Sequence, residues 1–346
     1  MRLGSLLITA LTLLLLSPAS HAKSDLEPGD TAPGLSIEEW LNGSEISLEE
    51  GTVYLVHFFQ PKEGRVQETV ERLSETQDEL GHRNLVVLGI TDEKSEEATR
   101  FVTARQDTLQ YTVGVDRRGV TTREWKKKAK PSGSSLFIVD RHLRIAWIGS
   151  PTSDEWEKVL HRVLRGRFNA KLEEEARPLL RAAERNRKIK NWREAKRYYD
   201  QVIELDHTVF ADVALERFEM MLVDMDDPEA AYTYLRGTLM GQWYAKDPNA
   251  LQDIAELITT DPDIPAEQRD LDLALQAARE MRRLADRRDW AALETLAMVH
   301  FHRGEFDEAV RWQKKAWMTA RPKHKAELKR QLVSYQHAEA RKPGNE

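Results

Sequence analysis

The sequence predicts an α/β sandwich followed by an all-α domain of repeated helices. Over residues 28–165, short apolar runs alternate with segments whose apolar residues recur every three or four positions. From about residue 171 to residue 340, only the helical spacing continues. The change falls at Arg165-Gly166-Arg167-Phe168, so we expect one domain at 28–165 and a second at 171–340.

The expected elements of the first domain follow one another in a mixed order. The strands are residues 53–59, 85–91, 111–115, 136–140 and 145–149, and the helices are residues 65–80, 95–106, 121–128 and 154–164. The first two strands are nearly continuous apolar runs, which is typical of central strands covered on both faces. Residues 140–144 join the last two strands and predict an antiparallel hairpin at an edge of the sheet.

The first 22 residues predict an export signal. Arg2 supplies a positive charge, residues 3–16 form an apolar core, and Ser20 and Ala22 occupy the small-residue positions of a cleavage site. The apolar run is shorter than the roughly 20 residues of a membrane span, so we expect cleavage rather than an uncleaved anchor. We therefore expect an exported protein, periplasmic or extracellular, with no stable membrane insertion after cleavage.

Composition excludes several functions. The chain contains no cysteine, so thiol-disulfide exchange and cysteine-peroxidase chemistry cannot use its own side chains. The formal net charge of −6, with acidic and basic residues interleaved, gives no ground for nucleic-acid binding. Metal-ligand spacings of histidine, Gly-rich phosphate loops and Gly-x-Ser-x-Gly motifs are all missing from the sequence. We expect no metal and no cofactor.

Three phrases in the first domain carry a resemblance to a known family. They are GDTAP at residues 29–33, GTVYLVHFF at residues 51–59 and FIVDRHLRI at residues 137–145. In this order they resemble the thioredoxin-like redoxins, of the alkyl hydroperoxide reductase/thiol-specific antioxidant type or the exported cytochrome-maturation type. The resemblance covers residues 28–165 and implies a thioredoxin-like fold with a Cys-x-x-Cys pair after the first core strand.

The same resemblance implies a degenerate redox site. Glu63 and Val66 stand where the family has its two cysteines, and Ser134 stands where it has a cis-proline. A carboxylate and an isopropyl group cannot replace a thiolate that attacks sulfur or peroxide. Because both halves of the site are altered, we expect that the chemistry was lost and that no residue is catalytic.

An enzymatic alternative stays open at this stage. His57 lies within the first core strand, where a single histidine is more often a packed residue than a ligand or base. Glu63 is either a general base or, more often, a solvated residue favoured near a helix N-terminus. The alternative is a thioredoxin-like enzyme or redox-pathway accessory that uses cysteine-independent chemistry at Glu63, His57 and Ser134, or the thiols of a partner.

The second domain contains a repeated phrase. Copies place Ala195, Ala230 and Ala309 after an acidic or polar start, and Ala274 with Ala278 heads a weaker copy. Two of the intervals are one residue longer than the tetratricopeptide period of about 34, and the phrases resemble those repeats. A small residue lets two antiparallel helices approach closely, and each helix pair needs the next pair to cover its apolar face. We expect three to four repeats.

The resemblance to tetratricopeptide repeats implies a protein or peptide partner. Trp243, Tyr244, Trp312 and Trp317 are more numerous than packing requires. We expect some of them to line the concave face, where such repeats bind extended peptides, and others to belong to the core. The leading hypothesis is a non-catalytic exported scaffold protein.

Overall fold

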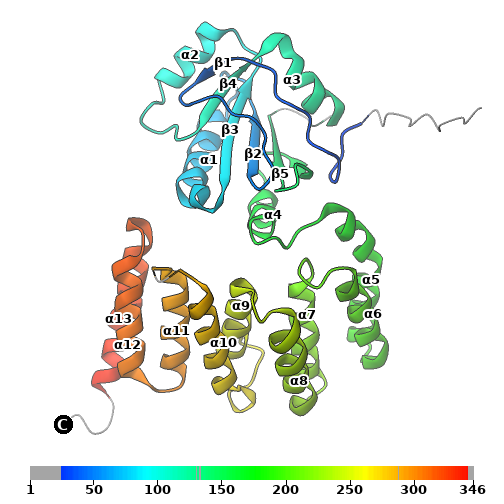
Figure 1. The fold of residues 1–346 in the computed structure, drawn as a ribbon, viewed down its shortest axis with the longest axis vertical. Coiled ribbons are helices and arrows are strands. Elements are labelled where there is room, and N and C mark those ends of the chain that lie inside the picture. The colour runs from blue at the N-terminus through cyan, green and yellow to red at the C-terminus, as the bar shows by residue number, and fades with distance from the viewer. Residues whose placement is uncertain (1–24, 130, 132–133, 287, 342–346) are drawn as a thin grey trace, which may run out of the picture.

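The computed structural model describes residues 25–129, 131, 134–286 and 288–341, so the expected export signal of residues 1–22 lies outside the described part. A six-stranded sheet comes first and a series of helices follows (Figure 1). The strands are β1 (Ile37–Leu41), β2 (Val53–Phe58), β3 (Leu85–Thr91), β4 (Thr112–Asp116), β5 (Ser135–Val139) and β6 (Ile145–Gly149). Their order across the sheet is β1-β4-β3-β2-β5-β6.

Parallel strands form the centre of the sheet. β3 pairs in parallel with β2 and β4, whereas β5 pairs antiparallel with β2 and β6, and β1 pairs antiparallel with β4. Helices α1 (Val66–Leu80), α2 (Ser95–Thr103) and α4 (Glu155–Leu164) contribute to the core on one face. The other face is covered by the chain before β2 and by the helix around Trp125. Every residue of β2 is therefore buried.

The sheet domain confirms the predicted α/β sandwich with two differences. Residues 85–91 and 145–149 form strands with the predicted bounds. β1 was not predicted, because this edge strand reads Ile-Glu-Glu-Trp-Leu and lacks both a continuous apolar run and strict alternation. Residues 121–128 were expected to form one helix, but the chain forms the short α3 (Val120–Thr122) and then a π-helical turn, Arg123–Lys127.

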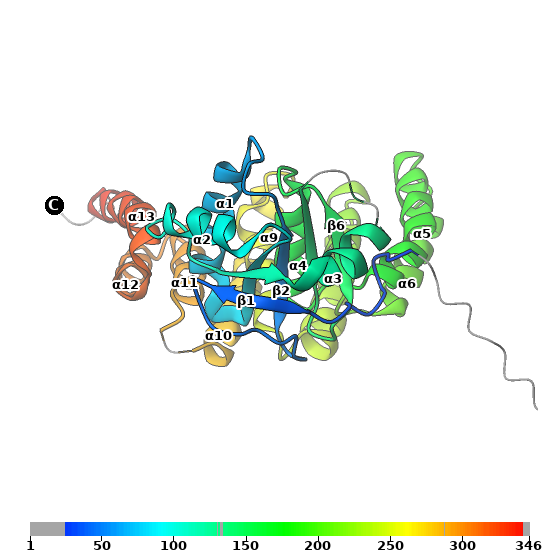
Figure 2. The same cartoon turned by 90° about the horizontal axis from the view of Figure 1, so that it is seen from above.

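Helix pairs make up the second part of the chain. The pairs are α5 (Ala170–Lys188) with α6 (Trp192–Leu205), α7 (Ala211–Glu219) with α8 (Pro228–Tyr234), α9 (Pro248–Thr260) with α10 (Leu271–Leu284), and α11 (Trp290–His302) with α12 (Phe306–Thr319); α13 (Pro322–Ala340) follows. Asp227 and Asp247 begin α8 and α9 by accepting hydrogen bonds from main-chain N–H groups, each followed by a proline at the first helical position. Figure 2 views the row of helices from above, through the sheet domain.

A fully buried alanine at the same place in the second helix of each pair explains the repeated phrase. Ala195, Ala231, Ala274 and Ala309 are each 0% exposed, and each lies four residues after the N-cap of α6, α8, α10 or α12. In the second pair the sequence comparison assigned this position to Ala230, which is only partly buried. That assignment is off by one residue, because the N-cap Asp227 corresponds to Asn191.

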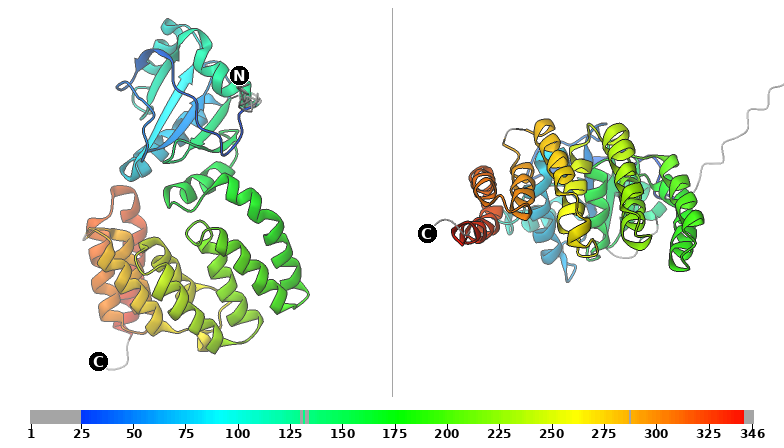
Figure 3. Two further views of the ribbon diagram at one scale, coloured as in Figure 1. Left: turned by 45° about the vertical axis from the view of Figure 1, so that its right-hand side comes forward. Right: turned by 90° about the horizontal axis from the view of Figure 1, so that it is seen from below.

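The sheet domain and the helices touch at both ends of the helical row. Residues 165–169 connect α4 to α5, and at the far end Arg321 Nη1 donates hydrogen bonds to the main-chain oxygens of Asp78 (2.9 Å) and Glu79 (3.0 Å). Lys323 Nζ lies 2.5 Å from a Glu79 carboxylate oxygen. The sheet domain thus lies across the ends of the helices (Figures 1 and 3).

Candidate functional site

Glu63 and Val66 occupy different environments between β2 and α1. Glu63 lies in the connecting loop, where its N–H donates to Gln60 O at 3.0 Å. Within the described part of the chain, no hydrogen bond or ion pair reaches the Glu63 carboxylate. Val66 is the first residue of α1, is 7% exposed and packs in the core beneath that helix. At the position of the family's second cysteine, this chain therefore has a packed apolar side chain, which carries no reactive group.

His57 and Ser134 lie in contact although 77 residues separate them in the chain. The antiparallel pairing of β2 with β5 sets Phe58 opposite Ser135 and so brings the start of β5 beside His57. His57 Nε2 lies 2.9 Å from Ser134 Oγ, and Ser134 Oγ donates to Phe58 O at 3.1 Å. Because the serine hydroxyl has one proton and gives it to Phe58, it accepts the second hydrogen bond from His57 Nε2–H. His57 Nδ1 is buried without a hydrogen-bond partner.

The environment of His57 keeps its imidazole neutral. Burial of the ring, with a smaller effect of the Lys126 charge, lowers the pKa of His57 to about 3. A base works best when its pKa lies near the working pH, and Nε2 already carries a proton. No carboxylate is hydrogen-bonded to Nδ1, so the orienting acid of a serine–histidine–acid triad is missing from the described residues. His57 and Ser134 thus form a hydrogen-bonded pair in which His57 is buried and Ser134 is partly buried.

The four aromatic residues singled out in the sequence lie in different surroundings. Tyr244 is buried, and its hydroxyl donates to His207 O at 2.6 Å. Trp243 stacks on His207 and is partly buried. Trp312 and Trp317 are partly buried in the packing of α11, α12 and α13. Trp243 and Tyr244 contact each other, with ring centroids 6.2 Å apart, whereas Trp312 and Trp317 lie together on α12.

An acidic groove between α7 and α9 was missed by sequence reasoning. It encloses about 370 Å³ and is lined by Asp212, Leu215, Glu216, Glu219, Asp253, Glu256, Leu257, Thr260 and Asp261, six carboxylates with no basic residue. The spacing of three or four residues between its acids on each helix is a signal that the sequence contains. Acidic residues are so common in these helices that the signal did not stand out.

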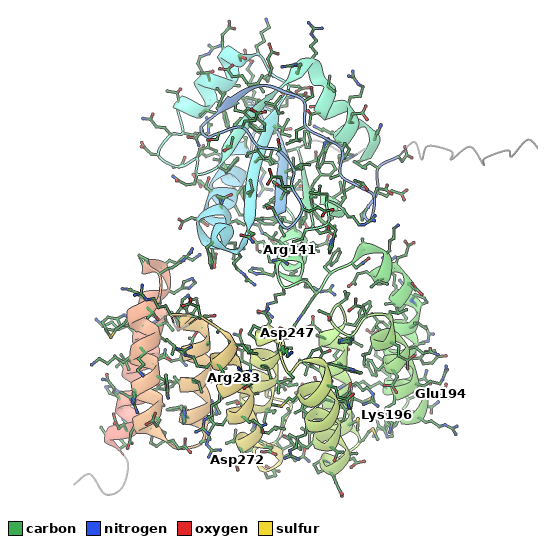
Figure 4. The ribbon with its side chains drawn as sticks, in the orientation of Figure 1. Arg141, Glu194, Lys196, Asp247, Asp272 and Arg283 are labelled. Carbon is green, nitrogen blue, oxygen red and sulfur yellow. The ribbon has the colours of Figure 1, made fainter. Side chains whose placement is uncertain are left out.

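Arg167 forms ion pairs with two of the carboxylates that line this groove. Its side chain is 1% exposed, and its Nη1 lies 2.5 Å from Asp253 Oδ2 and 3.1 Å from Asp212 Oδ1. Asp247 lies 3.8 Å from Nη2. Arg165 Nη1 also approaches Asp253, at 3.2 Å. Figure 4 labels Asp247 near the middle of the row, at the helix ends that face the sheet domain, and Arg141 on the facing edge of that domain.

Comparison with known families follows the division seen in the fold. Residues 28–148 match the model of the AhpC/TSA family, and residues 291–320 match a tetratricopeptide repeat. No curated protein matches the chain at a significant level. The two matches confirm a thioredoxin-like domain followed by tetratricopeptide-type helices.

Two similar solved structures each cover about two fifths of this chain. One is a thiol-disulfide isomerase from Corynebacterium glutamicum, 23% identical, with a TM-score of 0.33 over 38% of this chain and 96% of that protein. Another is the thioredoxin domain of a thiol-disulfide oxidoreductase from Bacteroides vulgatus, 17% identical, with a TM-score of 0.35 over 40% of this chain and 99% of that domain.

Among the described residues, none of the helices combines the length and the apolar character that a membrane span requires. No group of three or more histidine or acidic side chains there is arranged to hold a metal ion.

Proposed function

We propose that this chain, which joins a cysteine-free thioredoxin-like domain to tetratricopeptide-type helices, is an exported, non-catalytic scaffold that binds protein or peptide partners. Its working units are residues 28–165 and 171–340. The helices hold the partner, and the thioredoxin-like domain is a second docking module that rests on α13.

The state of the degenerate redox site carries this proposal. Glu63 and Val66 supply no nucleophile, and Val66 belongs to the core of the domain. The nearby His57 is neutral, buried and hydrogen-bonded to Ser134. A thioredoxin-like fold that is kept while both positions of the redox pair lack a thiol supports a binding role.

Partner contacts at the C-terminal pairs are part of the proposal. Trp312 and Trp317 keep partial exposure, as Trp243 does on the second pair. Large aromatic side chains with one exposed edge are favoured contact residues in protein interfaces. Tyr244 is buried beside Trp243 and supports the Trp243 side chain from the core.

A capture experiment tests the binding role. The mature protein, immobilised, is incubated with envelope extract, and proteins that free mature protein displaces are identified by mass spectrometry. We expect a small, reproducible set of displaced proteins. No displaceable protein in repeated experiments would overturn the proposal.

The 2.9 Å contact between His57 and Ser134 is the one observation that favours an enzyme. Insulin-disulfide reduction, peroxide turnover and ester hydrolysis test this second candidate, together with the possibility that a partner supplies thiols. Turnover that Glu63→Gln or Ser134→Ala abolishes would establish the enzyme. We expect no turnover above that of a heat-inactivated sample.

A further inference from the structure

The end of α1 and the start of α13 compensate each other's charge. Both helices lie wholly in the described part of the chain; α1 has no basic residue in its last turn, and α13 has no acidic residue in its first. A helix C-terminus is stabilised by cations and a helix N-terminus by anions. Arg321, the N-cap residue of α13, donates to main-chain oxygens at the end of α1, and Lys323 pairs with Glu79. Each helix end thus obtains from the other domain the charge that it lacks.

This contact is weaker than the other connection between the domains. The chain itself joins them through residues 165–169, where the buried Arg167 forms several ion pairs. In contrast, the side chains of Lys323 and Glu79 are 40% and 39% exposed. An ion pair as exposed as this shifts an equilibrium by at most about fivefold. The domains are therefore held firmly at residues 165–169 and weakly between α1 and α13 (Figure 3).

Two histidines lie at this weak contact, one on each side of it. His82 follows α1 in the 3-10 turn Gly81–Arg83, and His324 lies in the first turn of α13. The His324 ring stacks on Trp290, the first residue of α11, with ring centroids 4.4 Å apart. A protonated ring on either histidine adds a positive charge to the contact.

The groups around His82 favour its neutral form. Burial, and then the charge of Arg321 on the facing domain, lowers the pKa of His82, and the charge of Arg83 adds to this effect. A hydrogen bond to the Glu79 main chain and the charge of Asp289, the N-cap residue of α11, act in the opposite direction. The net result is a lowered pKa, so the closed contact disfavours a proton on His82.

His324 responds in the same way on the other side. Burial, and then the charge of Lys323, lowers the pKa of His324, and the charge of Arg321 adds to this effect. Glu79 on α1 acts in the opposite direction, but its carboxylate is already paired with Lys323. Protonated His324 would therefore be a surplus cation in the first turn of α13.

The wider surroundings of the contact also contain more cations than anions. Around the 3-10 turn and α4, the interacting charged and titratable groups are Arg83, Arg141, Arg165 and His161, against Glu79, Glu157 and Asp289. Glu157 is already paired with Arg72. Further positive charge on the two histidines therefore meets repulsion from both domains.

We propose that the contact between the end of α1 and the start of α13 is a pH-sensitive latch, closed at neutral pH and released when His82 and His324 become protonated. In the open form both rings are freed from the facing cations and regain the ordinary histidine pKa of 6.5. The open form thus binds the additional protons, so the latch weakens as the pH falls below that value. Release lets the sheet domain turn about residues 165–169 and uncovers the start of α11. The latch does not depend on the proposed binding function.

Fluorescence energy transfer within the full mature protein tests the latch. Because the chain has no cysteine, Glu75→Cys/Lys329→Cys introduces thiols for a donor and an acceptor dye at exposed positions of α1 and α13 alone. We expect the transfer efficiency to fall reversibly between about pH 7.5 and about pH 5.5. The ratio of closed to open molecules should fall roughly fourfold, since each partly exposed charge contributes about a factor of two.

Matched histidine variants in this labelled parent isolate the two rings. His82→Gln/His324→Gln removes the titrating groups, so its transfer efficiency should stay high at the lower pH. The control is His302→Gln/His337→Gln, which changes histidines near the opposite ends of α11 and α13. The control should lose transfer efficiency as the labelled parent does.

A third variant supplies the open reference. Arg321→Ala/Lys323→Ala should give low transfer efficiency at both pH values, because it removes the cations that hold the contact. A labelled parent with the same high efficiency at both pH values would overturn the latch. An equal fall in His82→Gln/His324→Gln and in its control would overturn it as well.

Discussion

Arg167 Nη1 lies 2.5 Å from Asp253 Oδ2, and this ion pair ties the segment after α4 to the third helix pair. The guanidinium is also close to Asp212 and Asp247. It neutralises carboxylates that come from two different helix pairs. These ion pairs therefore hold the segment between the two domains against the second and third helix pairs.

Replacing Arg167 should destabilise the protein strongly. Arg167→Met leaves Asp212, Asp247 and Asp253 without their shared cation, and breaking such a buried pair costs about 3 kcal/mol. Arg167→Lys keeps the positive charge but loses the planar guanidinium, so this variant should lose less stability than Arg167→Met. Urea unfolding followed by circular dichroism measures both. Equal stability of Arg167→Met and the wild type would refute the structural role.

Protonation of His57 should contribute to acid destabilisation. The folded-state pKa of about 3 lies below the ordinary value of 6.5. Between these values the unfolded chain binds the additional proton, so stability falls as the pH drops through this range. The additional proton bound by the unfolded chain lowers the free energy of unfolding by about 1.4 kcal/mol for each pH unit. Between pH 6.5 and 4.5 this lowers the free energy of unfolding by about 2–3 kcal/mol.

His57→Leu removes this contribution and leaves the Ser134 hydrogen bond to Phe58 intact. Its free energy of unfolding should fall about 2–3 kcal/mol less over that interval than that of the wild type. Urea titrations at the two pH values give the difference, with His142→Leu on the exposed hairpin as the matched control. A His57→Leu protein with wild-type pH dependence would show that the imidazole is not kept neutral.

Neighbouring alanines in α8 should respond differently to enlargement. Ala231 is 0% exposed, so Ala231→Leu overpacks the contact between paired helices and should cost about 2 kcal/mol. Ala230 is partly buried, and Ala230→Leu should cost less than about 1 kcal/mol. Thermal unfolding compares the two variants. A larger loss for Ala230→Leu would contradict the placement of the repeat position at Ala231.

The contact between α1 and α13 should open when its cations are removed. Arg321→Ala/Lys323→Ala deletes the donors to the end of α1 and the ion pair with Glu79. Exposed pairs contribute at most about 1 kcal/mol, so global stability should change little. Hydrogen exchange should rise at residues 78–84 and 321–324. Arg330→Ala, on the exposed side of α13, is the control, and equal exchange in both variants would contradict the contact.

Local sequence patterns predicted most of the fold, but not the contacts between distant segments. The apolar runs of β2 and β3 were recognisable because both faces of these strands are covered. The mixed pattern of the edge strand β1 gave no such signal. The contact of His57 with Ser134 depends on the pairing of β2 with β5, which neither segment encodes alone.

The acidic groove shows the same limit for the candidate site. Glu216 on α7 and Glu256 on α9 give no signal when each helix is read separately. They line one groove only because the helix pairs pack side by side. Arg167 lies in an irregular segment, and the sequence did not indicate its partners.

Quantitative capture from envelope extract tests the central claim most directly. The wild type and the doubly altered redox-site variant Glu63→Gln/Ser134→Ala are compared, and displaceable proteins are quantified by mass spectrometry. The binding account predicts that both proteins retain the same specific partners in similar amounts. Absence of any displaceable partner, or partners held by the wild type and lost when Glu63 and Ser134 are changed, would contradict it.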